Sequence, residues 1–130
     1  IIELDKYDVK ILPQRWGNTP FSFIKENPEW HFLTPHIVTQ LTAQPDIWMQ
    51  ITVPNEFQQV GKYNIGVTAG IESTIAPGDW VEGCQRMNLV LGSSKHTIDV
   101  FSTKTGNMLG FFEIHYHSFD NIYKFDFDMY

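Results

Sequence analysis

The sequence predicts an α/β fold, a three-layer domain built around a mostly parallel sheet. Two apolar runs, NIGVTAGI at residues 64–71 and NLVLGSS at residues 88–94, each end in small and polar residues. Strands of a parallel sheet are buried on both faces, so they appear as continuous apolar runs rather than as alternating patterns. A polar turn and a segment with helical spacing follow each run. This repeated strand–helix order implies right-handed crossovers and a Rossmann-like layer structure.

The first 54 residues are interpreted from weaker patterns. KYDVKILP at residues 6–13 is a predicted strand, and FSFIKENPEW at residues 21–30 is a short helix or turn broken by Pro28. HIVTQLTAQ at residues 36–44 has its apolar residues at helical spacing and is predicted to be a helix. DIWMQITVP at residues 46–54 is the next predicted strand.

Helices are predicted after both apolar runs. Asp79 is a plausible N-cap for a helix in DWVEGCQRM, residues 79–87. Ser94 is a plausible N-cap for a helix in KHTIDVFS, and NLVLGSS before it is taken as the last parallel strand. One face of the first helix carries three apolar residues at positions i, i+4 and i+7: Trp80, Cys84 and Met87.

The pattern changes from residue 103 onward. Aromatic and polar residues alternate in the last stretch, which is typical of a half-solvated strand. We therefore divide the chain into a partial Rossmann-like domain at residues 1–103 and a divergent tail at residues 104–130. The tail is predicted to form an antiparallel strand or hairpin.

Composition excludes several classes of partner. The chain has 130 residues, enough for one domain, with a formal net charge of −6 and a pI of about 5.2. No Lys/Arg cluster is present, so we expect neither a nucleic-acid partner nor a polybasic membrane-binding patch. The one cysteine, Cys84, permits no intramolecular disulfide and suits a reducing compartment, and we expect a cytoplasmic protein. No apolar run is long enough for a transmembrane segment.

Candidate ligand-binding residues follow two predicted strands. Ligand sites in open α/β sheets lie beyond the carboxyl ends of the strands. Thr68, Gly70 and Glu72 occupy that position in one case, and Asn55 and Glu56 in the other. The Glu72 carboxylate could accept hydrogen bonds from a hydroxylated ligand or act as a base. The alternative is a solvated loop acid before the next helix, and for Asn55 and Glu56 it is a simple turn.

Two further pairs are weaker candidates. Arg15 could clamp a phosphate or carboxylate, and Trp16 offers a flat face for a sugar or base. A surface-packed Trp beside a solvated Arg is the alternative. Ser93 and Ser94 open a helix whose free N–H groups could bind an anion, although ordinary helix capping explains the same residues.

No motif points to a metal or a dinucleotide. His115 and His117 would share one face of a strand, but no third ligand is evident, so no metal site is predicted. HExxH, CxxC, GxxxxGK[ST], GxSxG and GxGxxG are all absent from the sequence.

Three segments carry a resemblance to a known family. DIWMQITVPNEF, GKYNIGVTAGIEST and GDWVEGCQRMNLVLGSSKHT resemble the N-terminal Rossmann domain of GT-B glycosyltransferases of the family-four type. The resemblance covers about residues 5–101 and is more specific from residue 46 onward. It implies that Glu72 and Thr68 face the acceptor, with Asn55 and Glu56 nearby, and Arg15 and Trp16 as weaker matches.

The chain also departs from this family. Such enzymes have two Rossmann domains and bind the nucleotide sugar mainly in the C-terminal one, which has no counterpart here. The first strand with its Gly-rich loop also has no counterpart, and the tail after Thr103 matches no part of the family. We therefore expect a domain truncated at both ends.

The resemblance implies the acceptor-side half of an enzyme that transfers a sugar from a nucleotide-sugar donor to a hydroxylated, carbohydrate-like acceptor. The isolated chain is expected to be inactive and to hold no cofactor of its own. Two alternatives come from other classes. One is a non-catalytic binding module, or a subunit of a split transferase, that associates with itself or with a donor-domain protein. The other is a flavodoxin-like nucleotide binder, which the missing phosphate loop disfavours.

Overall fold

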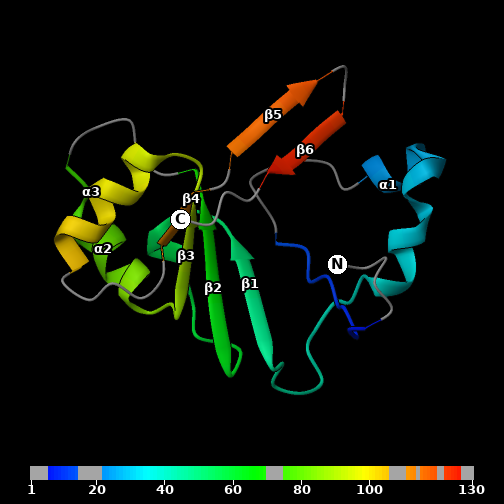
Figure 1. Cartoon of the computed structure of the whole chain (residues 1–130). Helices are drawn as coiled ribbons and strands as arrows, with labels where there is room; N and C mark the ends of the chain where they lie inside the picture. Colours follow the sequence, from blue (N-terminus) through cyan, green and yellow to red (C-terminus); the bar gives the residue numbers. More distant parts are fainter. Residues whose placement is uncertain are drawn as a thin grey trace. The chain divides into compact units, whose positions relative to one another are not determined.

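The structure is a computed structural model of the 130-residue chain. It describes residues 6–14, 22–69, 75–105, 111–113, 115–119 and 122–126, and the side chains among these up to residue 101. The chain forms two compact units, Ile1–Ala43 and Gln44–Tyr130 (Figure 1). The boundary expected at residue 103 stays a prediction.

The first unit contains a short helix and a long 3₁₀ segment. α1 spans Phe23–Glu26 and η2 spans Pro28–His36. Among the described residues of this unit, one parallel bridge pairs Ile11 with Ile37. In this bridge the Ile11 amide donates to the His36 carbonyl at 2.8 Å, and the Val38 amide donates to the Ile11 carbonyl at 2.9 Å.

The helix predicted at residues 36–44 is wrong. His36 ends η2, and Ile37 is extended because its main chain pairs with Ile11. Pro35 lies inside η2 and has no N–H to donate, which disfavours continued helix. The strand predicted at residues 6–13 is reduced to the one bridge at Ile11.

The second unit contains an all-parallel sheet in the order β1-β2-β3-β4. Its strands are β1 (Ile47–Ile51), β2 (Tyr63–Thr68), β3 (Leu89–Gly92) and β4 (Phe111–Glu113). This confirms a small α/β fold with a parallel sheet. It also confirms strands within the predicted segments that begin at residues 46, 64 and 88. β3 is not the last parallel strand, because β4 pairs alongside it.

Three connecting elements form a layer on one face of this sheet. They are η3 (Pro54–Glu56), α2 (Gly78–Gln85) and α3 (Lys95–Thr105), and α2 contacts both of the others (Figure 1). The strands follow one another in sequence order, so right-handed crossovers place all their connections on the same face. Among its described residues, the second unit therefore has a parallel sheet with one layer of helices.

The tail contains two further strands. β5 (His115–Phe119) and β6 (Ile122–Asp126) pair as an antiparallel hairpin, with Tyr116 opposite Phe125.

The hydrophobic core lies between the sheet and the helix layer. Its buried members come from the loop after η3, from α2 and the residues on either side of it, from β3 and from α3: Phe57, Ala76, Cys84, Met87, Val90, Val100 and Phe101. Trp80 packs at its margin and stacks on Phe101, with ring centroids 6.4 Å apart. Of the three residues predicted to share one helix face, Trp80 and Cys84 lie on α2 and contact the core, whereas Met87 is buried two residues beyond the end of α2.

Glycines allow the layers to approach closely. A Cβ on Gly66 of β2 would meet the Phe57 ring at 2.5 Å, so the ring occupies the space that a side chain would fill. A Cβ on Gly83 would overlap the main chain of Pro54, which brings α2 directly against η3. These two glycines fix the spacing of the helix layer over the sheet.

The opposite face of the sheet is apolar; we call it the apolar face. The register of β1, β2 and β3 aligns Ile47, Met49, Ile51, Tyr63, Ile65, Val67, Leu89 and Leu91 on it. Ile51 is 73% exposed and Ile47 is 56% exposed, which is unusual for strands of a parallel sheet. This face is therefore the largest departure from the expected three-layer arrangement among the described residues.

The first turn of α2 differs from its predicted cap. Pro77 is the N-cap residue, and Asp79 is the second residue of the helix. The Asp79 carboxylate accepts a hydrogen bond from the Trp80 amide at 3.0 Å. Its negative charge in the first turn still favours the helix through the helix dipole.

Candidate functional site

The carboxyl ends of β1, β2 and β3 lie side by side. Thr68 is in register with Gly92, and the Thr52 amide donates to the Val67 carbonyl at 3.2 Å. This edge is where open α/β sheets bind ligands. The structure therefore brings the predicted residues Thr68, Ser93 and Ser94 to neighbouring strand ends.

Hydroxyl groups fasten β2 to the start of α3 at this edge. The carbonyl oxygen of Ala69, the residue after β2, accepts hydrogen bonds from Ser93 Oγ at 2.7 Å and from Thr97 Oγ1 at 3.2 Å. Thr97 is only 3% exposed and also contacts the Ser94 hydroxyl at 3.1 Å. The carbonyl of Ala69 is thus held by hydroxyls from the segment before α3 and from the first turn of α3.

Ser94 caps α3 as predicted. Its Oγ accepts a hydrogen bond from the Thr97 amide at 3.2 Å, and its carbonyl accepts one from the Ile98 amide. Both hydroxyls of the predicted anion site, those of Ser93 and Ser94, are thus engaged within the protein. Thr68 is 5% exposed, so its side chain belongs to the helix-side interior.

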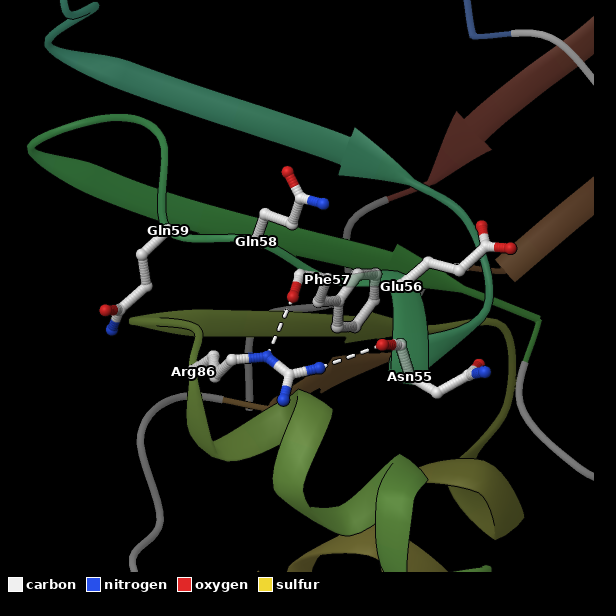
Figure 2. A pocket seen from close by; sticks show the side chains of 6 residues that line it. All are labelled: Asn55, Glu56, Phe57, Gln58, Gln59 and Arg86. Carbon is white, nitrogen blue, oxygen red and sulfur yellow. Dashed lines mark hydrogen bonds between the residues drawn. The ribbon is translucent and has the colours of Figure 1, made fainter.

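Asn55 and Glu56 lie in η3, directly after β1, and line an open pocket of about 410 Å³. The pocket is shown in Figure 2; its lining is Asn55, Glu56, Phe57, Gln58, Gln59 and Arg86. Thr68, Ser93 and Ser94 are not part of that lining. The structure therefore separates the predicted residues into a strand-end group and a pocket group.

Arg86 forms one wall of this pocket. Its Nε donates to the Phe57 carbonyl at 2.8 Å, and its Nη2 donates to the Asn55 carbonyl at 2.9 Å (Figure 2). The guanidinium group is therefore held by two main-chain acceptors, 29 and 31 residues earlier in the chain. No ion pair links Arg86 to a carboxylate in the part of the chain that the structure describes.

Gln50 supports the pocket loop from beneath. This residue of β1 is 5% exposed, and its Nε2 donates to the Glu56 carbonyl at 2.8 Å. Its Oε1 accepts the Gln58 amide at 3.0 Å. Because a buried amide with satisfied hydrogen bonds is well fixed, Gln50 ties the loop of residues 56–58 to β1.

Two side chains of the second unit, Cys84 and Asp46, have shifted pKa values. Burial raises the pKa of the Cys84 thiol to about 12, although the nearby Arg86 charge lowers it. This pKa makes Cys84 a poor nucleophile near neutral pH. At the amino end of β1, the hydrogen bond and charge of Lys62 lower the pKa of Asp46 across a 2.7 Å ion pair.

Several predicted site residues lie outside the described residues: Gly70, Glu72, Arg15 and Trp16. His115 and His117 are alternate residues of β5, opposite Asp126 and Lys124. Within the described ranges, no group of three or more His, Cys, Asp or Glu is placed to hold a metal ion. Nor is any helix in those ranges both long and apolar enough to cross a bilayer.

Sequence reasoning missed Arg86, Gln50 and Thr97. Arg86 and Thr97 lie within predicted helices and Gln50 within a predicted strand, so each looked like an ordinary surface or strand residue. The one available signal was Gln50, a polar residue inside the apolar run IWMQITV.

Comparison with known proteins gives no assignment. No protein-family model matches the chain, and neither a curated protein nor a solved structure is significantly similar to it.

Proposed function

We propose that this chain is the acceptor-side domain of a GT-B-type glycosyltransferase and is inactive by itself. The supporting observation is the parallel order β1-β2-β3-β4, with the carboxyl ends of its first three strands side by side. In a doubly wound sheet of order 3-2-1-4-5-6, the strands on one side of the switch point follow one another in this way. Three consecutive strands of this four-stranded sheet follow that order, which supports the proposal.

The proposed chemistry is sugar transfer to an acceptor hydroxyl. The acceptor oxygen forms a bond to the anomeric carbon of the donor sugar, and the bond from that carbon to the nucleotide breaks. The nucleotide leaves with the bonding electron pair, and Glu72 takes the hydroxyl proton. The hydroxyls of Ser93 and Thr97 support this role, because they hold the carbonyl of Ala69, three positions before Glu72 in the sequence. The donor site belongs to a second domain.

The deciding experiment uses a complete enzyme that contains this domain. Glu72→Gln should lower the rate of transfer at least about a hundredfold, since a general base contributes about that much or more. Glu82→Gln, an exposed acid on α2, is the matched control and should leave the rate near that of the wild type. Unchanged turnover in Glu72→Gln would exclude this role. Sugar transfer by the isolated chain would contradict its proposed inactivity.

A second candidate function is a binding module or a subunit of a split transferase. The observation that favours it is the apolar face, whose β1 and β2 residues are 42% to 73% exposed at Ile47, Met49, Ile51 and Tyr63. Exposed contiguous apolar surface of this kind marks protein interaction sites. Sedimentation of the purified chain over a range of concentrations tests for self-association. A chain that stays monomeric and also captures no donor-domain protein would argue against this function.

A further inference from the structure

The guanidinium group of Arg86 is only partly used by the protein. An arginine side chain carries five N–H donors. Two of them are engaged by the Phe57 and Asn55 carbonyls, and the others, including both on Nη1, make no hydrogen bond with the described residues. Figure 2 shows the third nitrogen of the group without a drawn hydrogen bond. The group is therefore fixed in position while much of its donor capacity remains open.

Its positive charge is also uncompensated within the described residues. The only carboxylate in the pocket lining is that of Glu56, and Figure 2 shows it turned away from the guanidinium group. The two carbonyl acceptors are neutral. A half-buried, pre-positioned guanidinium with open donors is well suited to a carboxylate or phosphate group, which it binds through paired charge-assisted hydrogen bonds.

The remaining lining suits hydroxyl groups. Asn55, Gln58 and Gln59 offer amide donors and acceptors, and Glu56 offers acceptors only. The pocket volume of about 410 Å³ lies within the range of small-molecule sites. The lining thus combines one cationic fork with groups that pair with sugar hydroxyls.

We propose that this pocket binds an anionic sugar, with the acidic group on the open edge of Arg86 and the hydroxyls on the amides and Glu56. This inference deepens the proposed function and rests on it only in taking the ligand for a carbohydrate acceptor. A carboxylate and a phosphate share the required chemistry, so a sugar acid and a sugar phosphate are both ligands of this class.

The test compares three probes on the purified chain: methyl glucoside, methyl glucuronide and glucose 6-phosphate. Binding is followed by NMR at the backbone amides of residues 55–59 and at the Arg86 Nε–H, which is readily assigned because the chain has only two arginines, Arg15 and Arg86. Both anionic probes should bind at least about tenfold more tightly than the neutral one, and the tighter of the two identifies the acidic group.

Variants separate the fork from general electrostatics. Arg86→Lys keeps the charge but loses the planar fork, and it should weaken anion binding at least about tenfold. Lys62→Gln, which removes a cation at the other end of β1, should have little effect on it. Glu56→Gln removes a negative charge that repels the phosphate of the ligand, and it keeps the main-chain hydrogen bonds that hold Arg86. It should therefore tighten binding of glucose 6-phosphate several-fold.

Equal binding of methyl glucoside and methyl glucuronide, or equal losses in Arg86→Lys and Lys62→Gln, would overturn the anion site. No binding of any probe at residues 55–59 would overturn it as well. None of these results bears on the Glu72→Gln transfer assay, so failure of this inference is distinguishable from failure of the proposed function.

Discussion

Gly83 lies where α2 packs against the turn that follows β1. A Cβ there would overlap the Pro54 main chain, whereas a Cβ on Gly78, in the same helix, would have no neighbouring atom within 4 Å. We expect Gly83→Ala to lower the free energy of unfolding by about 1–3 kcal/mol, because overpacking forces the backbone to shift. Gly78→Ala should be neutral or stabilising by up to about 1 kcal/mol, since alanine favours helix.

Urea denaturation of both glycine variants measures this difference. Equal stabilisation by the two alanines would show that α2 and η3 are not in direct contact, and the pocket beside Arg86 would then need another geometry.

Cys84 gives the protein a specific response to alkaline pH. The unfolded thiol ionises near pH 9, whereas burial keeps the folded thiol protonated until about pH 12. The unfolded state therefore binds fewer protons in this window, and Cys84 lowers stability as pH rises from 9 towards 12, by at most about 1.4 kcal/mol per pH unit. Below pH 9 it adds no pH dependence.

The measurement is the unfolding free energy of the wild type and Cys84→Ala at several pH values. The variant loses the buried sulfur at every pH, and the difference in unfolding free energy between the two proteins should shrink above pH 9. A constant difference would mean that the thiol is accessible to water in the folded state.

At the scale of elements, the N-terminus of α3 depends on one hydroxyl. Ser94 Oγ accepts the Thr97 amide, so Ser94→Ala leaves a helix donor without its cap. The expected loss of stability is about 1 kcal/mol. Ser94→Asp restores an acceptor and adds a charge favoured by the helix dipole, so it should recover most of that loss. Thermal unfolding distinguishes them, and equal effects of alanine and aspartate would show that the hydroxyl does not cap the helix.

The elements of the second unit were predictable because their signals are strong. The runs around Val67 and Val90 are continuous and largely apolar, and Ser94 stands at the position of an N-cap before a segment with helical spacing. The segment after His36 was mispredicted, because the spacing of Ile37, Val38 and Leu41 fits a helix. Pairing with Ile11, 26 positions earlier, makes Ile37 extended rather than helical, and no local sequence pattern reveals that pairing.

The candidate site was only partly predictable. Strand ends can be located from apolar runs, so the positions of Thr68, Asn55 and Glu56 at or just after strand ends were predictable, whereas their role as site residues stays a prediction. Arg86 was not, because its partners are main-chain carbonyls of Asn55 and Phe57 brought near by the packing of α2 on η3. Every residue type supplies a main-chain carbonyl, so the identity of the partner residue does not reveal such a contact.

For the whole molecule, the apolar face is the feature that decides between the candidate functions. Ile51→Lys places a charge on a residue that is 73% exposed, so stability should change by no more than about 0.5 kcal/mol. If this face binds a second chain, the same change should abolish association seen for the wild type in sedimentation velocity.

Phe32→Lys, at a half-exposed aromatic of the other unit, is the matched control and should leave association unchanged. Equal effects of the two lysines would indicate nonspecific adhesion. A large loss of stability in Ile51→Lys would show that the apolar face is covered within the folded chain.

The sequential order of the strands also bears on how the protein is made. Each strand of the sheet pairs with the one synthesised just before it, and no described strand of this sheet must wait for a distant segment. Domains can fold as they emerge during synthesis, and nearby pairings close shorter loops. The sheet can therefore grow one strand at a time on the ribosome, with each new strand covering the edge left by its predecessor.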